Sequence, residues 1–433
     1  MPTGDEDAWR YSRIGQIGLE RFCPVVAAGA ADATPLEPMV QDFLDGFPER
    51  AGLVVTSDGF PVSTELAENA ASSGVRLGAA SLDPDAEGLL GSVVGAFPVS
   101  EVDGFGALAD AFAPDAVMLW VPAGVALSSP VFVVHTIGQG AAGGQGGAIG
   151  QGAAGGQGDA GGQGDAGSQG GAGAPMGAVF PRTLVYLGEN AEATVIELLV
   201  SPDGVEPILV LPTVELSACD GARLSHDLVQ HLGRNAWQVA RLAATAGRDS
   251  TLRSFQASLG GGYARVQTDS VLTGQGGSTE LLAAFFGDGD QMHDFHTLQE
   301  HAAPRTKSDL VFKGAVAGTS RSVYNGLIRM RHGAKGANAF QTNRNLVLSD
   351  GAHADSVPNL DIQENDVRCS HASAVGPVDE EQRFYLESRG VPRAVAERLI
   401  LLGFFSELFD RVNPRVGELV LGRIAERVQA VTS

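Results

Sequence analysis

The sequence predicts a mainly β protein built around a parallel β-solenoid, with a mixed α/β N-terminal region and a C-terminal helical domain. Short runs rich in Val, Leu and Ile recur through the centre of the chain, and turns of small residues separate them. No helical period interrupts this centre, whereas helical spacing of apolar residues returns near the C-terminus. We expect the boundaries to fall at 1–100, 101–377 and 378–433.

Composition limits the function classes. The 433 residues include 44% hydrophobic but only 6% aromatic side chains, so a large core must be aliphatic. The formal net charge is −22. Such a surface repels phosphate backbones and anionic lipid heads, so we expect neither nucleic acid nor a membrane as partner.

Location and redox state follow from the termini and the cysteines. The acidic N-terminus has no apolar run of the secretory kind, and no stretch reaches the ~20 apolar residues of a membrane helix. Cys23, Cys219 and Cys369 lie far apart, which fits a reducing cytoplasm and not a disulfide framework. We expect a cytoplasmic protein in which Cys23 and Cys219 are small buried apolar groups.

The first hundred residues are expected to be partly helical. Ser63 and Thr64 are candidate caps for a short helix through Ala71, which Gly74 would end. A second helix is predicted over Asp103–Ala113. Four strands are then predicted, at Ala116–Trp120, Pro130–His135, Leu184–Leu187 and Ala193–Val200.

Residues 137–178 form a low-complexity insert with GGQG as its recurring phrase. The insert has almost no large apolar side chain, so we expect a disordered surface loop between two strands. Lengthening a loop from ~5 to ~40 residues costs about 1.8 kcal/mol of closure entropy, which a large core tolerates.

Turns of small residues then recur, as in CDGARL at Cys219, TGQGGS at Thr273 and DGAHAD at Asp350. Many short strands between such turns are typical of a sandwich, a barrel or a parallel β-solenoid. Hairpin turns of the Asn-Gly or Asp-Gly kind are few. Repeating turns without intervening helices therefore favour the solenoid, in which each coil stacks on the last.

The tail is predicted to be helical. Asp379 and Gln382 resemble a capping box, Gly390 is a candidate stop, and Pro392 suits the first turn of another helix. One apolar face is formed at helical spacing by Val395, Leu399, Leu402, Phe405, Leu408 and Val412, and a last helix should run from about Val416 to Val428. We expect this domain to cap one end of the solenoid, since an open end exposes strand edges.

Cys369 and His371 are the principal candidate ligands. On a strand they share one face, with Cα atoms about 6.6 Å apart, and a thiolate and an imidazole together suit a soft metal or a cluster. Two ligands do not complete such a site, so others must come from elsewhere or from a partner. The alternative is a core strand, because Val367 lies on the same face.

A second cluster, GDGDQMHDFHTLQEH, contains His293, Asp294, His296 and His301. It lacks zincin spacing, so hydrogen-bonded structural histidines are the favoured interpretation and a metal site the alternative. The chain has no Walker A loop and no GxSxG elbow. We therefore expect it neither to bind nor to hydrolyse nucleotides itself.

Several further segments are characteristic: DEDAWRYSRI, FPRTLVYLGENAEATVIE, the histidine cluster, and most of all NAFQTNRNLVLSDGAHADSVPNLDIQENDVRCSHASAVG followed by FYLESRGV. In these segments the chain resembles the SufB/SufD family of iron–sulfur cluster assembly scaffolds, and its SufD branch in particular. The chain departs from the family at Ala372 and Ser373, where Gly and Thr are common, and at Val357, where Lys is common. The Gly-rich insert is not a family feature.

The resemblance implies a right-handed parallel β-helix and a non-enzymatic scaffold subunit of a SufBCD-type complex. It implies that the β-helix pairs with a SufB-like protein and that the C-terminal helices dock a SufC-like ATPase. His371, with Cys369 as a supporting or alternative ligand, would hold a transient iron–sulfur cluster shared with the partner. The alternatives are a SufB-like primary scaffold, against which the few cysteines argue, and a β-solenoid enzyme acting on polysaccharide.

Overall fold

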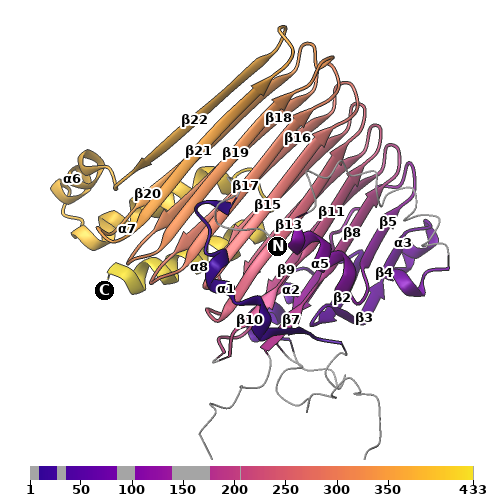
Figure 1. Ribbon diagram of the computed structural model, residues 1–433, viewed down its shortest axis with the longest axis horizontal. Coiled ribbons are helices and arrows are strands. Elements are labelled where there is room, and N and C mark those ends of the chain that lie inside the picture. The colour runs from indigo at the N-terminus through magenta and orange to yellow at the C-terminus, as the bar shows by residue number, and fades with distance from the viewer. Residues whose placement is uncertain (1–8, 27–35, 85–102, 139–175, 205, 433) are drawn as a thin grey trace, which may run out of the picture.

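The computed structural model describes residues 9–26, 36–84, 103–138, 176–204 and 206–432. Its centre is a flattened solenoid in which two long sheets face each other and the chain alternates between them (Figure 1). Neighbouring strands pair in parallel and in register, as in Met292 with Arg321 and Lys307 with Asn338, except that β3 and β4 at the N-terminal end pair antiparallel with β2 and β5. The parallel solenoid is therefore confirmed over the sandwich and the barrel.

Sheet A contains β4 (Arg76–Ala79), β5 (Val117–Val121), β8 (Arg182–Leu187), β11 (Thr213–Ala218), β13 (Ala236–Ala246), β15 (Tyr263–Leu272), β17 (Met292–His301), β19 (Arg321–Met330) and β21 (His353–Ile362). Sheet B contains β2 (Gly52–Ser57), β3 (Phe60–Leu66), β6 (Val131–Thr136), β9 (Glu192–Val200), β12 (Arg223–His231), β14 (Thr251–Ser258), β16 (Ser278–Gly287), β18 (Lys307–Val316), β20 (Asn338–Val347) and β22 (Arg368–Gly376). At the margin of sheet A lie the short strands β1 (Phe22–Pro24), β7 (Met176–Val179) and β10 (Ile208–Val210).

The N-terminal region is mixed, as predicted, and also contains α1 (Ile14–Ile17), η2 (Leu19–Arg21), α2 (Pro38–Asp45), α3 (Glu68–Ser72), η3 (Ala80–Leu82) and α5 (Gly104–Phe112). The carboxylate of Asp103 accepts hydrogen bonds from two backbone amides of α5, which confirms that helix. The predicted helix beginning at Ser63 is wrong in its first part. Asp58 and Gly59, both at positive φ, turn the chain so that β3 pairs antiparallel with β2, and the helix starts only at Glu68.

The four predicted strands are confirmed as β5, β6, β8 and β9. The ends of the predicted insert belong to the core, because Ile137 is fully buried and Ala178 lies in β7. The expected disorder concerns residues 139–175, which lie outside the described residues.

The lumen between the sheets contains apolar clusters and buried polar side chains. Val195, Leu224 and Leu252 belong to one buried cluster at the N-terminal end, and Phe285 and Phe312 to another nearer the C-terminal end. Between these clusters, buried amides bond across the lumen: Gln230 to Gln238 at 2.7 Å and Gln256 to Thr268 at 3.0 Å.

The tail consists of α6 (Glu380–Ser388), α7 (Arg393–Phe409) and α8 (Pro414–Thr432). The carboxylate of Asp379 accepts hydrogen bonds from two amides of α6, as expected for its cap. No helix in the described part of the chain is both long and apolar enough to cross a bilayer.

The expectation that the tail caps one end of the solenoid is wrong. α7 and α8 lie along the outer face of sheet B (Figure 1), where Phe405 and Leu408 pack in one cluster with Phe255 and Leu282. Outward side chains of sheet B such as Phe255 and Leu282 are apolar, so the apolar face of α7 packs on them. Arg427 of α8 adds an ion pair to Asp288 at 2.9 Å. At the C-terminal end of the solenoid, β21 and β22 each have one neighbour in their sheet among the described residues.

Candidate functional site

Cys369 and His371 lie on β22, the last strand of sheet B. This strand pairs only with β20 in the described structure, so its other edge carries unpaired backbone groups. In the register, Cys369 lies beside Ala339 and His371 beside Gln341. The two candidate ligands therefore occupy the terminal coil of the solenoid.

Both side chains belong to the inward face of that coil. Cys369 is half-buried against the cluster that contains Ile328 and Ala339. Ser373 donates a hydrogen bond of 2.8 Å from its hydroxyl to that of Ser356 on β21, across the lumen. Because side chains alternate along a strand, His371 lies on the same face as Cys369 and Ser373. The predicted shared face is confirmed.

The two residues differ in accessibility. His371 is exposed, since no further coil of the described chain covers it, whereas Cys369 contacts the apolar core. Burial raises the pKa of the Cys369 thiol. A thiol must lose its proton to bind a metal, so the imidazole of His371 is the more available ligand of the isolated chain.

Three buried amides lie directly under this end and were missed by sequence reasoning. Gln341, Asn343 and Asn345 face inward on β20, in register with His371, Ser373 and Val375. Asn345 donates to Asn343 at 2.7 Å, while the amide of Gln341 has no hydrogen-bond partner in the described structure. The alternation of polar residues at 341, 343 and 345 is the signal that could have found them.

The histidine cluster does not form one site. His293 and His301 point into the lumen, where His301 contacts the hydroxyls of Thr306 and Ser308 at 2.7 and 2.8 Å. Asp294 and His296 lie on the opposite face of β17 and contact each other at 2.9 Å. The structure therefore places these residues as structural, hydrogen-bonded groups.

Asp294, on the outer face of β17, has a carboxylate whose pKa is set by its neighbours. Arg265 lies 2.6 Å from one carboxylate oxygen, and the hydroxyl of Tyr263 donates to the same oxygen at 2.9 Å. Burial alone raises the pKa of Asp294, but the charge of Arg265 and the contact with His296 outweigh it and lower the pKa to about 2.

A further buried trio was not expected. Glu197 contacts His135 and His226 at 3.2 Å each, deep in the lumen. Burial alone raises the pKa of Glu197, yet hydrogen bonds from the two histidines lower it to about 2. These residues are far apart in sequence and meet only because the coils stack, so no local pattern could have found them. Among the described residues, no group of three or more His, Cys, Asp and Glu side chains is arranged to hold a metal ion.

The expectation for the other cysteines is wrong. Cys23 is exposed on the marginal strand β1, and Cys219 is half-buried in a turn. The Cys219 thiol donates to the hydroxyl of Tyr186 at 3.1 Å, and Tyr186 stacks on Trp120 with ring centroids 3.9 Å apart. Turn and margin positions leave these side chains without a core around them.

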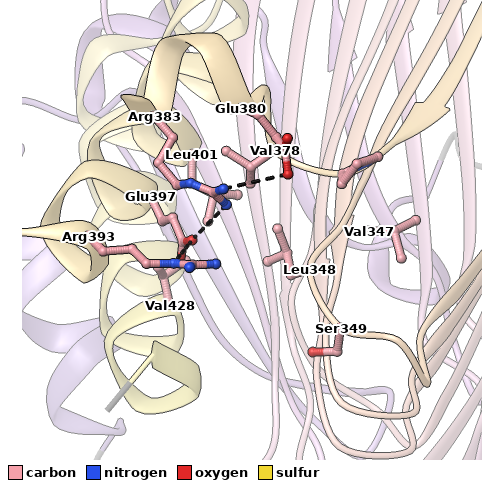
Figure 2. A pocket seen from close by; sticks show the side chains of 11 residues that line it. Val347, Leu348, Ser349, Val378, Glu380, Arg383, Arg393, Glu397, Leu401 and Val428 are labelled. Atoms are coloured by element: carbon pink, nitrogen blue, oxygen red, sulfur yellow. Dashed lines mark hydrogen bonds and ion pairs between the residues drawn. The ribbon is translucent and has the colours of Figure 1, made fainter. Parts of the chain in front are cut away.

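A pocket of about 280 Å³ separates the tail from the turn after β20 (Figure 2). Glu397 of α7 contacts Arg393 at 3.0 Å and Arg383 of α6 at 3.4 Å, and Arg383 also contacts Glu380 at 3.5 Å. The two guanidinium groups therefore already have carboxylate partners. Of these ion pairs, the one between Arg383 and Glu397 links α6 to α7, and α6 itself has no buried residue.

Comparison with known proteins relates this site to a protein family. Residues 169–404 match the family model described as SUF system FeS cluster assembly, SufBD core domain. The chain belongs to the SufBD family. The resemblance found in the sequence is thus confirmed, and the matched SufBD segment includes both Cys369 and His371.

Relatives within the SufBD family are similar over about half of the chain. An iron–sulfur cluster assembly SufBD family protein of Mycobacterium tuberculosis is 38% identical over 229 residues, or 51% of this chain and 58% of that protein. SufD of Escherichia coli is 31% identical over 244 residues, or 56% and 57%. SufD of Bacillus subtilis is 29% identical over 254 residues, or 58% and 56%. Each match covers less than two-thirds of the relative.

Proposed function

We propose that this chain is a non-enzymatic scaffold subunit of a SufBCD-type complex for iron–sulfur cluster assembly. The single observation that supports this is the exposed His371 near the half-buried Cys369 on β22, a strand whose outer edge has no partner in the described structure. Because the chain belongs to the SufBD family, iron and sulfide are the species that we expect this strand edge to bind. A SufB-like partner would supply the ligands that complete the cluster site.

The ligand chemistry suits a cluster that must be handed on. A neutral imidazole binds iron and is released more readily than a thiolate, so His371 is the primary ligand in this proposal. Cys369 is the supporting ligand, because burial raises the pKa of its thiol. The cluster is a transient cargo and not a resident cofactor.

The partner would dock on the open end. The backbone edges of β21 and β22 are unpaired there in the described structure. Leu360, Ile362 and Val375 are also exposed, by 38%, 49% and 44%. Unpaired strand edges with exposed apolar side chains are surfaces on which another strand or solenoid can add.

A SufC-like ATPase would dock on the exposed apolar side chains of the C-terminal helices. Of the apolar face predicted in the tail, Phe405, Leu408 and Val412 are buried against sheet B, whereas Leu399 is not. Phe384 and Tyr385 of α6 are 72% and 58% exposed, and Leu399 of α7 is 48% exposed. These three side chains are the available apolar contacts for an ATPase.

The test is cluster reconstitution in the complex with the SufB-like partner. His371→Ala should reduce the cluster formed, whereas His353→Ala should not, because His353 is also exposed but lies on β21 in a contact with Asp355. Equal cluster yields in the two variants, with the complex intact, would reject the role of His371. A cytoplasmic location remains a prediction.

Two alternatives remain from the sequence. A SufB-like primary scaffold would assemble a stable cluster on the isolated chain, which reconstitution without a partner measures. A solenoid enzyme acting on polysaccharide would release sugars from an acidic polysaccharide, and no such activity is expected.

A further inference from the structure

The side chain of Gln341 crosses the lumen directly below the terminal coil. A Cβ atom placed on Gly326, in β19 of the opposite sheet, would lie 2.3 Å from Nε2 of Gln341 and 2.4 Å from the hydroxyl oxygen of Tyr324. The amide of Gln341 therefore fills the space that any larger residue at 326 would take. The glycine is required here by space and makes room for a polar group.

The side-chain amide of Gln341 lowers the stability of the fold, because it is buried without a partner in the described structure. Gln341 is 1% exposed, and neither Nε2 nor Oε1 has a hydrogen-bond partner among the described residues. Buried amides without partners destabilise a fold, and an apolar side chain of the same length would avoid that loss. The amide therefore calls for an explanation other than packing.

Its position relative to His371 provides one. The two residues are register partners on neighbouring parallel strands, and both face inward. Their strands are about 4.8 Å apart, so the imidazole can approach the amide from above. The register partner of Cys369 is Ala339, which offers no acceptor, and Ser373 already bonds Ser356. Gln341 and Asn345 both carry an unpaired amide oxygen in this row, and of the two only Gln341 is in register with His371.

We propose that Gln341 is the positioning residue of His371. When one imidazole nitrogen of His371 binds the iron of the cargo, the other donates its N–H to Oε1 of Gln341. Histidines that bind metals generally donate their second N–H to an acceptor, which fixes the tautomer and the ring orientation. This inference rests on the proposed function, because it requires His371 to be a ligand.

The experiment uses the full chain in complex with the SufB-like partner, which supplies the remaining ligands, and Co²⁺ as the probe, because its absorption reports imidazole and thiolate ligation. We compare the wild type with His371→Ala, Gln341→Met, Gln341→Glu and Gln299→Met. Gln299 is the matched control: it is also fully buried in the lumen with an unpaired Oε1, but lies on β17, two coils away from β21 and β22. The melting temperature of each variant is measured in parallel.

Gln341→Met should weaken the His371-dependent Co²⁺ binding about ten-fold or more. Gln341→Glu restores an acceptor and should recover it, while Gln299→Met should leave it unchanged. The melting temperature of Gln341→Met should stay level or rise, since an unpaired buried amide is lost. A purely structural role would instead lower the melting temperature without a selective effect on Co²⁺.

The outcomes separate the two proposals. If His371→Ala weakens Co²⁺ binding and Gln341→Met does not, the positioning role is overturned and the ligand role stands. If Gln299→Met weakens it as much as Gln341→Met, the effect is not specific to Gln341 and the inference fails. If His371→Ala has no effect, the ligand role itself fails, and the positioning role fails with it.

Discussion

Lys313 of sheet B and Glu407 of α7 form an ion pair of 2.5 Å in which one partner is buried and the other is exposed. The side chain of Lys313 is 3% exposed and that of Glu407 is 74% exposed. Lys313 also donates to the backbone carbonyl of Phe404 at 2.8 Å. The ammonium group of Lys313 thus lies at the interface between sheet B and α7.

This asymmetry predicts unequal effects of the two possible deletions. Glu407→Ala leaves a buried ammonium without its carboxylate, which should cost about 1–3 kcal/mol of unfolding free energy. Lys313→Met replaces the ammonium by an apolar chain and leaves only an exposed carboxylate, so its cost should be smaller. Chemical denaturation of both variants measures the order. A larger loss for Lys313→Met would contradict this account.

His301 should make the fold sensitive to mild acid. Burial lowers the pKa of His301 to about 4, below the ordinary value of 6.5. Between these values the unfolded chain binds a proton that the folded chain does not, so stability is fully present above pH 6.5 and falls as the pH drops toward 4. His301→Gln should reduce this slope by about 1.4 kcal/mol per pH unit. Identical slopes in denaturation from pH 6.5 to 4 would argue against it.

Gly314 should not tolerate a methyl group. A Cβ atom there would lie 1.9 Å from Cζ of Phe285 in the lumen. Gly314→Ala should therefore cost about 1–3 kcal/mol, and adding Phe285→Leu should recover part of that loss. The control is Gly403→Ala in α7, where nothing lies within 4 Å and helix propensity should improve. Thermal denaturation distinguishes them, and equal effects at the two glycines would refute the packing argument.

The ATPase surface has a direct test. Phe384→Ala combined with Tyr385→Ala should weaken binding of a SufC-like ATPase without changing the melting temperature, because both side chains are exposed. The control is Leu82→Ala, since Leu82 is 82% exposed in the N-terminal region. Titration calorimetry gives the affinities. Unchanged binding in the double variant would move the docking surface elsewhere.

Local signals predicted much of this fold. Asp103 and Asp379 begin helices where their side chains can accept backbone amides, and runs of Val, Leu and Ile became strands. Alternation also placed Cys369 and His371 on one face correctly. These features depend on a few consecutive residues, so the chain carries them locally.

Features that depend on stacking were not predictable. Ser63 lies in a strand because the turn at Asp58 pairs it with β2, which overrides its capping tendency. The tail lies on sheet B because α7 and the outer face of the sheet are both apolar, a match of two distant segments. Gln341 became visible only once the register with His371 was known.

The strands of the C-terminal coils are equal in length, and this determines where such a chain can gain or lose residues. Each strand from β15 to β21 has ten residues. Deleting one residue inside such a strand would send every following side chain to the opposite face, so lumen residues would meet solvent. Insertions and deletions should therefore collect at the turns. A long segment separates β6 from β7, yet the pairing of β6 with β9 is in register. A solenoid of this kind can gain sequence at its corners while its walls admit only exchange of one side chain for another.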